Sequence, residues 1–226
     1  MELHTDFSQR VILHTEQMPW LPSPAAGVER RQLDRQGEEV ARATSIVRYA
    51  SGSYFAAHTH GGGEEIFVLE GVFSDEHGHY PPGSYLRNPP GTTHTPFSEP
   101  GCVIFVKLWQ FDPADRTHVR IDTNKMRFVA LADRPGVSVM PLFNDGNEDV
   151  CLEQWAPGAD IAIDAPGGIE ILVLDGTFEE AGEMLGRMAW LRLPRGSRSR
   201  AAVSDQGARV WIKRGHLLAD PQPPAV

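Results

Sequence analysis

The sequence repeats itself at a distance of about 106 residues, and this internal repeat restricts the possible folds more than any other feature. Four blocks of similar residues recur in the same order with a nearly constant offset. They are 27–40 with 136–150, 65–73 with 170–178, 85–91 with 190–196, and 101–107 with 207–213. Chance does not preserve both order and spacing over four blocks. The repeat therefore predicts two homologous domains, which we place at 1–116 and 117–226.

Each repeat has the pattern of short β-strands. Segments rich in Ile, Val, Phe and Tyr are bounded by Gly, Pro, Asn or Asp, as expected for strands separated by tight turns. In the first repeat these segments are 44–50, 64–73, 84–88 and 102–109. The chain holds 22 glycines and 18 prolines without a low-complexity run, which fits many turns. The sequence thus predicts an all-β fold of the sandwich or barrel type.

The composition excludes several classes of protein and partner. The formal net charge of −9 argues against a nucleic-acid-binding surface, which needs clustered Lys and Arg. No apolar stretch approaches the ~20 residues that cross a bilayer, and the first residues lack the pattern of a signal peptide. Two cysteines, Cys102 and Cys151, allow neither a disulfide framework nor a multi-cysteine zinc module. We therefore expect a cytoplasmic protein with no nucleic-acid or membrane partner.

The first repeat contains a histidine pattern typical of a metal site. His58 and His60 are two residues apart on an extended segment, so both imidazoles point to the same side of the chain. Three consecutive glycines then let the chain reverse tightly, which returns Glu64 on the neighbouring strand. A later turn rich in proline and glycine can deliver His94 to the same place. Three imidazoles and one carboxylate form a suitable ligand set for a divalent transition metal.

A purely structural role for these side chains is less favourable than a metal site. A lone strand histidine usually has a structural role or is exposed. Here a structural role would leave four polar groups unpaired in a barrel core, so we favour the metal site. Glu65 points to the opposite face of the strand from Glu64, which makes Glu64 the expected ligand. His77 and His79 lie in a predicted hairpin turn, where we expect them to be solvated, and His118 has no ligand-like spacing.

The histidine-containing segments resemble the two sequence motifs of the cupin superfamily. The match runs from Gly52 to Gly71 and from Gly83 to His94, and it departs from the second motif at Ser98, where an asparagine is usual. Three sequence segments, 63–78, 87–91 and 106–108, resemble the cupin-like domain of the anti-sigma factor ChrR.

The resemblance implies two tandem cupin barrels, each a double-stranded β-helix or jelly roll. It also implies that the first barrel holds one divalent transition metal, with the ligands His58, His60, Glu64 and His94. Zinc is the favoured metal, and iron, manganese and nickel are the alternatives. The resemblance assigns no catalytic residue.

The second repeat lacks the metal-site residues. In an alignment on Gly176, the position of His58 falls at Ile163 or Asp164, and that of His60 falls at Ala165 or Pro166. The position of Glu64 falls at Ile169, and that of His94 falls at Ser199. We therefore expect a degenerate barrel that binds no metal and serves as a structural partner or a dimer surface. A homo-oligomer is the expected assembly.

The sequence is compatible with two functions. The resemblance to ChrR implies a sensor or regulatory cupin that responds to oxidants and acts through a protein partner. The sequence lacks the Cys-x-x-Cys pair of the sigma-binding zinc domain, so the anti-sigma relation rests on the cupin alone. The alternative is a metal-dependent dioxygenase or isomerase whose substrate, a small organic acid or diketone, binds inside the barrel.

Overall fold

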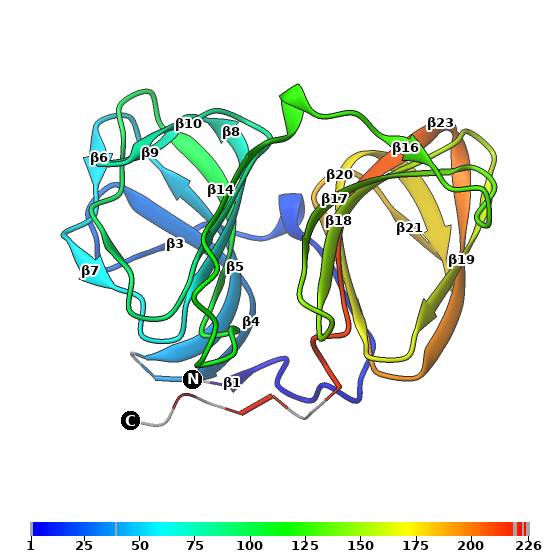
Figure 1. Ribbon diagram of the computed structural model, residues 1–226, viewed down its shortest axis with the longest axis horizontal. Helices are drawn as coiled ribbons and strands as arrows, with labels where there is room; N and C mark the ends of the chain where they lie inside the picture. Colours follow the sequence, from blue (N-terminus) through cyan, green and yellow to red (C-terminus); the bar gives the residue numbers. More distant parts are fainter. Residues whose placement is uncertain (1, 39, 219–220, 223, 225–226) are drawn as a thin grey trace. The chain divides into compact units, whose positions relative to one another are not determined.

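The computed structural model describes the whole chain except residues 1, 39, 219–220, 223 and 225–226. Its contacts divide the chain into two units (Figure 1). The first unit is built on Pro19–Lys125, and the second is built on Asp6–Met18 together with Met126–Pro221. Strands make up nearly all the regular structure of both units, which confirms the predicted all-β class. In the described part of the chain, no helix is long and apolar enough to cross a membrane.

The first unit is a small barrel of one large and two small sheets. Its strands are β1 (Glu2–Leu3), β3 (Leu21–Pro22), β4 (Val28–Gly37), β5 (Ala41–Tyr49), β6 (Ser53–Tyr54), β7 (His58–Thr59), β8 (Glu64–Gly71), β9 (Phe73–Asp75), β10 (Gly78–Tyr80), β11 (Ser84–Asn88), β12 (Thr93–His94), β13 (Phe97–Ser98), β14 (Cys102–Leu108) and β15 (Val119–Asp122). The large sheet has the order β1-β4-β5-β14-β8-β11-β15, with β3 beside β4. The small sheets are β10-β9-β13-β6 and β12-β7.

The second unit is a single curled sheet. Its strands are β2 (Val11–His14), β16 (Val129–Ala130), β17 (Val137–Asn144), β18 (Asp149–Trp155), β19 (Asp160–Ala165), β20 (Ile169–Glu180), β21 (Glu183–Leu185), β22 (Ala189–Leu193) and β23 (Ser197–Arg214). The order is β16-β17-β18-β23-β20-β22-β2, with β19 on β23 and β21 on β20. The two units confirm the predicted pair of jelly-roll barrels.

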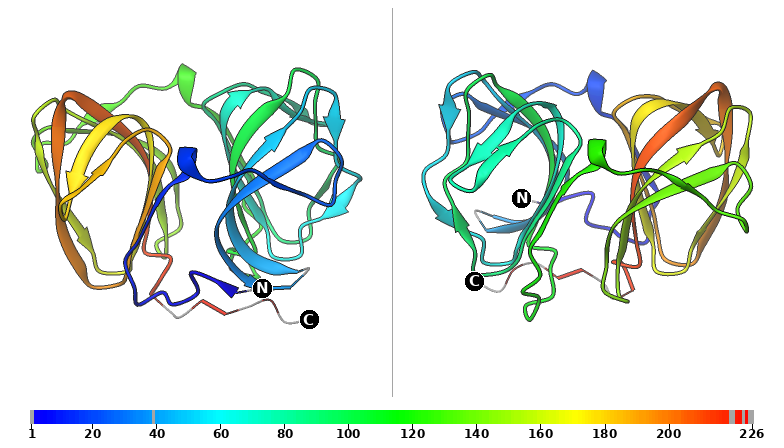
Figure 2. Two further views of the ribbon diagram at one scale, coloured as in Figure 1. Left: turned by 180° about the vertical axis from the view of Figure 1, so that it is seen from behind. Right: turned by 45° about the horizontal axis from the view of Figure 1, so that its top comes forward.

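Each repeat begins with a strand that belongs to the unit of the other repeat. Strand β2 pairs with β22 in the second unit, and β15 pairs with β11 in the first (Figures 1 and 2). Each of these strands is followed by a short 3-10 turn, at Thr15–Gln17 and at Thr123–Lys125. The units therefore differ from the predicted domains 1–116 and 117–226 in these two segments. Pairing with the added strand satisfies the backbone groups along the edges of β11 and β22.

The inner face of the first barrel combines an apolar core with polar residues. Alternate residues of β5 and β14 point inward, among them Val47, Tyr49, Ile104 and Val106, and they pack with Phe73 in one buried cluster. This cluster fills only part of the interior. Beside the apolar cluster, at the ends of β7, β8 and β12, lie the buried polar residues His60, Glu64 and His94.

Candidate metal centre

Strand pairing places His58 and His94 directly opposite each other. Strands β7 and β12 form a two-stranded antiparallel sheet with His58 paired to His94 and Thr59 paired to Thr93. His60 follows this pair, and two backbone hydrogen bonds hold it: its N–H donates to the Thr92 carbonyl at 2.8 Å, and its carbonyl accepts from Gly91 N–H at 2.8 Å. The pairing of β12 with β7 thus brings His94 to the other two histidines, as predicted.

The three glycines before Glu64 allow a close approach of Trp109 to the backbone. A Cβ atom on Gly62 would lie 2.3 Å from Cε3 of Trp109, and one on Gly61 would lie 2.5 Å from Cζ2 of the same ring. Gly63 has φ +79°, a conformation that L side chains rarely adopt. The glycines therefore provide the tight reversal that the sequence predicts, and they also make room for an aromatic ring over the loop, which it did not predict.

The four predicted ligands lie together. One ligand atom from each of His58, His60, Glu64 and His94 lies within 4.8 Å of all the others, and three of the four residues are buried. Glu64 Oε2 is 3.3 Å from His60 Nε2 and 3.4 Å from His94 Nε2. Both Nε2 atoms are buried, and neither has a hydrogen-bond partner among the described residues. Buried nitrogens that converge on a carboxylate without a partner fit a bound cation, so the side chains present are suited to a divalent metal.

The opposite ring nitrogens orient the three imidazoles. His58 Nδ1 lies 3.0 Å from the Ala56 carbonyl, which can only accept a hydrogen bond. His60 Nδ1 lies 3.0 Å from Thr92 Oγ1. That hydroxyl donates its own proton to the Pro89 carbonyl at 2.8 Å, so it accepts from His60. Nδ1 therefore carries the proton on these rings and Nε2 presents its lone pair to the centre, as metal-binding histidines require.

His94 is held by a buried carboxylate. Its Nδ1 is 3.3 Å from Asp75 Oδ2, while Asp75 Oδ1 accepts from the backbone N–H groups of His77 and Gly78. Burial raises the pKa of Asp75, but the hydrogen bonds from His94 and His77 outweigh it and hold that pKa below its ordinary value. Burial also lowers the pKa of His60, which favours the neutral ring that binds a metal. For His94, burial lowers the pKa, but the hydrogen bond with Asp75 and the negative charges of Glu64 and Asp75 together outweigh it and raise the pKa.

Glu64 is oriented by a second chain of polar contacts. Asn88 Nδ2 donates to Glu64 Oε2 at 3.0 Å, and Arg120 donates to Asn88 Oδ1 at 2.6 Å. Arg120 lies on β15, the strand that joins this unit from the start of the second repeat. The exchanged strand therefore supports the position of a predicted ligand.

A cavity of about 410 Å³ borders the candidate metal centre. His58, His60 and Glu64 lie in its wall, and apolar residues of β5 and β14 form much of the rest. Arg30, Tyr49 and Trp109 line the same cavity. None of these three was predicted as a site residue, because the spacing of residues along the chain does not indicate the register in which the strands pair. A cavity of this size fits a small organic molecule.

A second cavity, of about 210 Å³, borders the same histidines. It is lined by His60 and His94 together with His77, His118 and Arg120, among others. His77 and His118 are exposed. Exposure agrees with the prediction that His77 is solvated, while the position of both beside the candidate ligands could not be predicted from their spacing.

Glu65 and its neighbours face the other side of the large sheet. The Tyr85 hydroxyl donates to Glu65 Oε1 at 2.5 Å, and Arg87 lies 3.6 Å from the same oxygen. On the same face, Lys107 donates to Thr44 Oγ1 at 2.9 Å. These buried polar contacts are structural, and they confirm that Glu64, not Glu65, faces the three histidines.

At the equivalent positions the second barrel has three apolar residues and one serine. Ile163 of β19 lies directly opposite Ser199 of β23, as His58 lies opposite His94 in the first barrel. Ile163, Ala165 and Ile169 are buried in one hydrophobic cluster. These side chains offer no metal ligand, which agrees with the alignment on Gly176.

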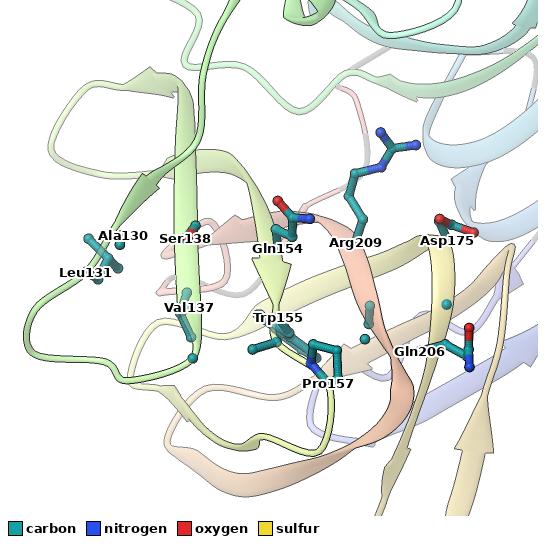
Figure 3. A pocket seen from close by; sticks show the side chains of 15 residues that line it. Ala130, Leu131, Val137, Ser138, Gln154, Trp155, Pro157, Asp175, Gln206 and Arg209 are labelled. Atoms are coloured by element: carbon teal, nitrogen blue, oxygen red, sulfur yellow. The ribbon is translucent and has the colours of Figure 1, made fainter.

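The second unit has its own cavity, of about 600 Å³, at a different place (Figure 3). Its lining includes Gln154, Trp155, Asp175 and Arg209, and it contains no histidine or cysteine. Asp175 and Arg209 are exposed. This cavity therefore lacks the ligand set of a transition-metal site.

Comparison with known proteins supports the fold and the family. Among solved structures, a “putative dioxygenase” from Nostoc punctiforme is similar, with a TM-score of 0.78 at 16% identity over 97% of this chain and 87% of that one. A “putative glyoxylate induced protein” from Pseudomonas aeruginosa has a TM-score of 0.76 at 12% identity, over 100% of this chain and 94% of that one. Oxalate decarboxylase from Bacillus subtilis has a TM-score of 0.62 at 10% identity, over 89% and 76%. At these identities the likeness shows the fold.

The family assignment comes from sequence. No curated protein matches this sequence. A family model described as the ChrR cupin-like domain matches residues 8–112 and 116–218, so that it covers nearly all of both repeats. Each matched region includes the strand that is exchanged between the units, β2 in the first and β15 in the second. The chain belongs to the family of ChrR cupin-like domains.

Proposed function

We propose that the first barrel is the metal-dependent catalytic site of a dioxygenase or isomerase that acts on a small organic substrate. The observation that carries this proposal is the cavity of about 410 Å³ whose wall contains three of the four candidate ligands. A purely structural metal is usually enclosed by protein, whereas a catalytic metal needs space for a substrate beside it.

The residues of the chain have separable tasks at this site. The Nε2 atoms of the three histidines and the Glu64 carboxylate would hold the metal, and Asp75, Thr92 and Asn88 orient them. A bound divalent metal supplies a Lewis acid for substrate oxygens. The apolar wall from β5 and β14 limits the access of water to the bound substrate.

A sensor function is the second candidate, because both repeats match the ChrR cupin-like domain. In such a protein the metal, zinc by preference, would link an oxidant signal to a protein partner. Burial raises the pKa of the Cys102 thiol to about 11 and that of Cys151 to about 12. Neither cysteine is a reactive thiolate near neutral pH, so a sensor built on this chain would respond through the metal centre.

The two candidates differ in oxygen consumption. Untagged protein is loaded with Fe²⁺ or with Zn²⁺ and supplied with a panel of small organic acids and diketones in an oxygen electrode. We expect substrate-dependent oxygen uptake by the iron form and none by the zinc form or by iron-treated His94→Ala. The sensor function would be favoured by two results together. Oxygen uptake would stay at background with every compound of the panel, and the zinc form would bind a specific protein partner. An isomerase appears instead as conversion of a panel compound without oxygen uptake.

A further inference from the structure

We propose that Arg30 and Tyr49 form a carboxylate-binding subsite in the cavity of the first barrel, so that the substrate is a small organic acid rather than a diketone. This inference rests on the proposed function, and it names the substrate class of the same site. It assigns a task to two residues that neither hold the metal nor orient its ligands.

The register of β4 and β5 directs Arg30 into the barrel. Arg30 lies opposite Val47, and Val28, two residues before Arg30 on the same strand, is buried in the core of the barrel. Side chains two residues apart on a strand share a face, so Arg30 points inward like Val28. Val47 and Tyr49 line the cavity together with Arg30.

The Arg30 guanidinium has no partner among the residues that the structure describes. No hydrogen bond or ion pair is formed by its side chain, although the residue is half-buried. The neighbouring arginines differ in this respect: Arg48 donates to Glu29 Oε2 at 3.0 Å, and Arg42 lies 3.8 Å from Asp34. A half-buried, unpaired guanidinium in the wall of a cavity is unfavourable unless an anion binds there.

Partial burial affects the pKa of the Arg30 guanidinium. Burial lowers the pKa of Arg30, and the positive charge of Arg35, which lines the same cavity, lowers it further. An arginine remains protonated even so. The cavity wall thus carries two guanidinium groups against one carboxylate, that of Glu64, and this balance favours a small anion.

Tyr49 lines the same cavity as Arg30 and three of the four candidate ligands. Its ring is packed edge-on against Phe55 and Phe73, with centroid distances of 5.7 and 6.0 Å. In the described part of the chain its hydroxyl makes no hydrogen bond, and it interacts electrostatically with both Glu64 and Arg30. A phenol is neutral near pH 7, so Tyr49 can donate a hydrogen bond to a carboxylate that Arg30 holds.

The rest of the cavity limits the size and shape of the acid. Ile104, Val106 and Leu108 supply an apolar wall, and His58, His60 and Glu64 lie in the wall of the same space. A short acid fits this arrangement if its carboxylate meets Arg30 and Tyr49 while a carbonyl or hydroxyl oxygen reaches the metal centre. A neutral diketone would leave the guanidinium unpaired.

Two ligands that differ only in charge test this inference. Acetoacetate and acetoacetamide share one carbon skeleton and one ketone, and the amide replaces the carboxylate. Their binding to zinc-loaded protein, which does not turn over with oxygen, is measured by calorimetry. The variants are Arg30→Gln, Arg30→Lys and Tyr49→Phe, and Arg48→Gln serves as the control because Arg48 is paired with Glu29. Stabilisation of the metal-free protein by acetoacetate is measured in parallel.

We expect wild type to prefer acetoacetate by about tenfold or more, which is the contribution of one charge-assisted contact. Arg30→Gln removes the preference with unchanged zinc content, Arg30→Lys and Tyr49→Phe reduce it, and Arg48→Gln preserves it. Equal binding of the two ligands by wild type, or a preference that survives in Arg30→Gln, overturns the inference. Neither result bears on metal binding or on the oxygen-uptake assay. The carboxylate subsite can therefore be wrong while the proposed function is right, and the experiments distinguish the two cases. Stabilisation of metal-free wild type but not of metal-free Arg30→Gln supports the subsite independently of the metal.

Discussion

Asp75 and His94 form a buried contact in which the carboxylate Oδ2 lies 3.3 Å from the imidazole Nδ1. The second oxygen of Asp75 is occupied by backbone donors, so the carboxylate cannot turn away from His94. The contact fixes both the tautomer and the direction of the ring, which leaves Nε2 free to bind a metal. A residue that touches no metal thereby decides how one candidate ligand is presented.

Asp75→Asn should weaken metal binding while all four candidate ligands remain. Loss of a carboxylate behind a metal-binding histidine reduces affinity by ~10–100-fold. Metal affinity is measured by competition with a chromophoric chelator. Asp145→Asn is the matched control, since Asp145 also accepts two backbone N–H groups, from Asn147 and Glu148, in a turn of the second unit. An affinity equal to that of wild type in Asp75→Asn would show that Asp75 does not orient His94.

Glu64→Gln and Glu65→Gln should have different effects although the two residues are adjacent. Glu64→Gln weakens metal binding, but by less than the loss of a histidine, because three imidazoles remain. Glu65→Gln leaves metal binding unchanged and lowers the free energy of unfolding by about 2 kcal/mol, since Tyr85 and Arg87 lose a charged partner. Metal titration and urea unfolding of both variants check this. Equal effects on metal affinity would contradict the assignment of Glu64 as the ligand.

Gly62→Ala should disturb both the loop and the metal centre. The added Cβ would meet the Trp109 ring at 2.3 Å, so the ring or the loop must move. We expect a loss of about 1–3 kcal/mol in the free energy of unfolding and weaker metal binding, because His60 and Glu64 flank the glycines. Gly186→Ala is the control, since its Cβ would meet only a Thr177 methyl group at 3.5 Å. Urea unfolding that is unchanged in Gly62→Ala would argue against the packing of Trp109 over the loop.

The stability of the second unit should depend on pH through Glu153. Its Oε1 lies 2.5 Å from Arg134 and 2.7 Å from Arg214, and Oε2 accepts from the Trp155 indole at 2.7 Å. Burial raises the pKa of Glu153, but the charge of Arg214 and the hydrogen bond from Arg134 outweigh it and lower that pKa. This stabilisation is complete above the unfolded pKa of about 4.3 and is lost as the pH falls through the lower folded pKa.

Glu153→Gln should therefore be less stable than wild type by about 3 kcal/mol at pH 7, and the difference should shrink in acid below pH ~4. Urea midpoints of wild type and variant between pH 3 and pH 7 measure it. Asp160→Asn removes the exposed pair with Arg200 and should leave the midpoint nearly unchanged. A difference between wild type and Glu153→Gln that is independent of pH would contradict a stabilising role of the Glu153 charge.

The sequence was sufficient to predict that the four residues of the candidate metal centre lie together, because three of them are close in sequence and the fourth follows a turn rich in proline and glycine. His58 and His60 share a strand face through their spacing, and short turns bring Glu64 and His94 to the same end of the barrel. Arg30, Tyr49 and Asp75 could not be found in this way. Arg30 faces the cavity only because β4 pairs with β5 in the observed register, and no spacing within β4 indicates that register.

The domain boundary shows the same limit. The repeated blocks begin at residues 27 and 136, so they contain neither β2 nor β15, and a repeat cannot indicate which barrel such a strand joins. In the structure β15 pairs with β11, where Arg120 supports Asn88 and through it Glu64. Each of the two strands joins the barrel whose sheet edge it covers, β22 for β2 and β11 for β15. The position of these edges cannot be read from the repeat.

Metal content tests the metal centre of the first barrel most directly. Wild type, His58→Ala and His94→Ala are purified without a histidine tag or chelator, and their metals are identified and counted by elemental analysis. We predict about one divalent transition metal per wild-type chain, and none in either variant, together with a lower melting temperature of both variants. A full complement of metal in both variants, or two metals per wild-type chain, would contradict the assignment of a single metal centre to these ligands.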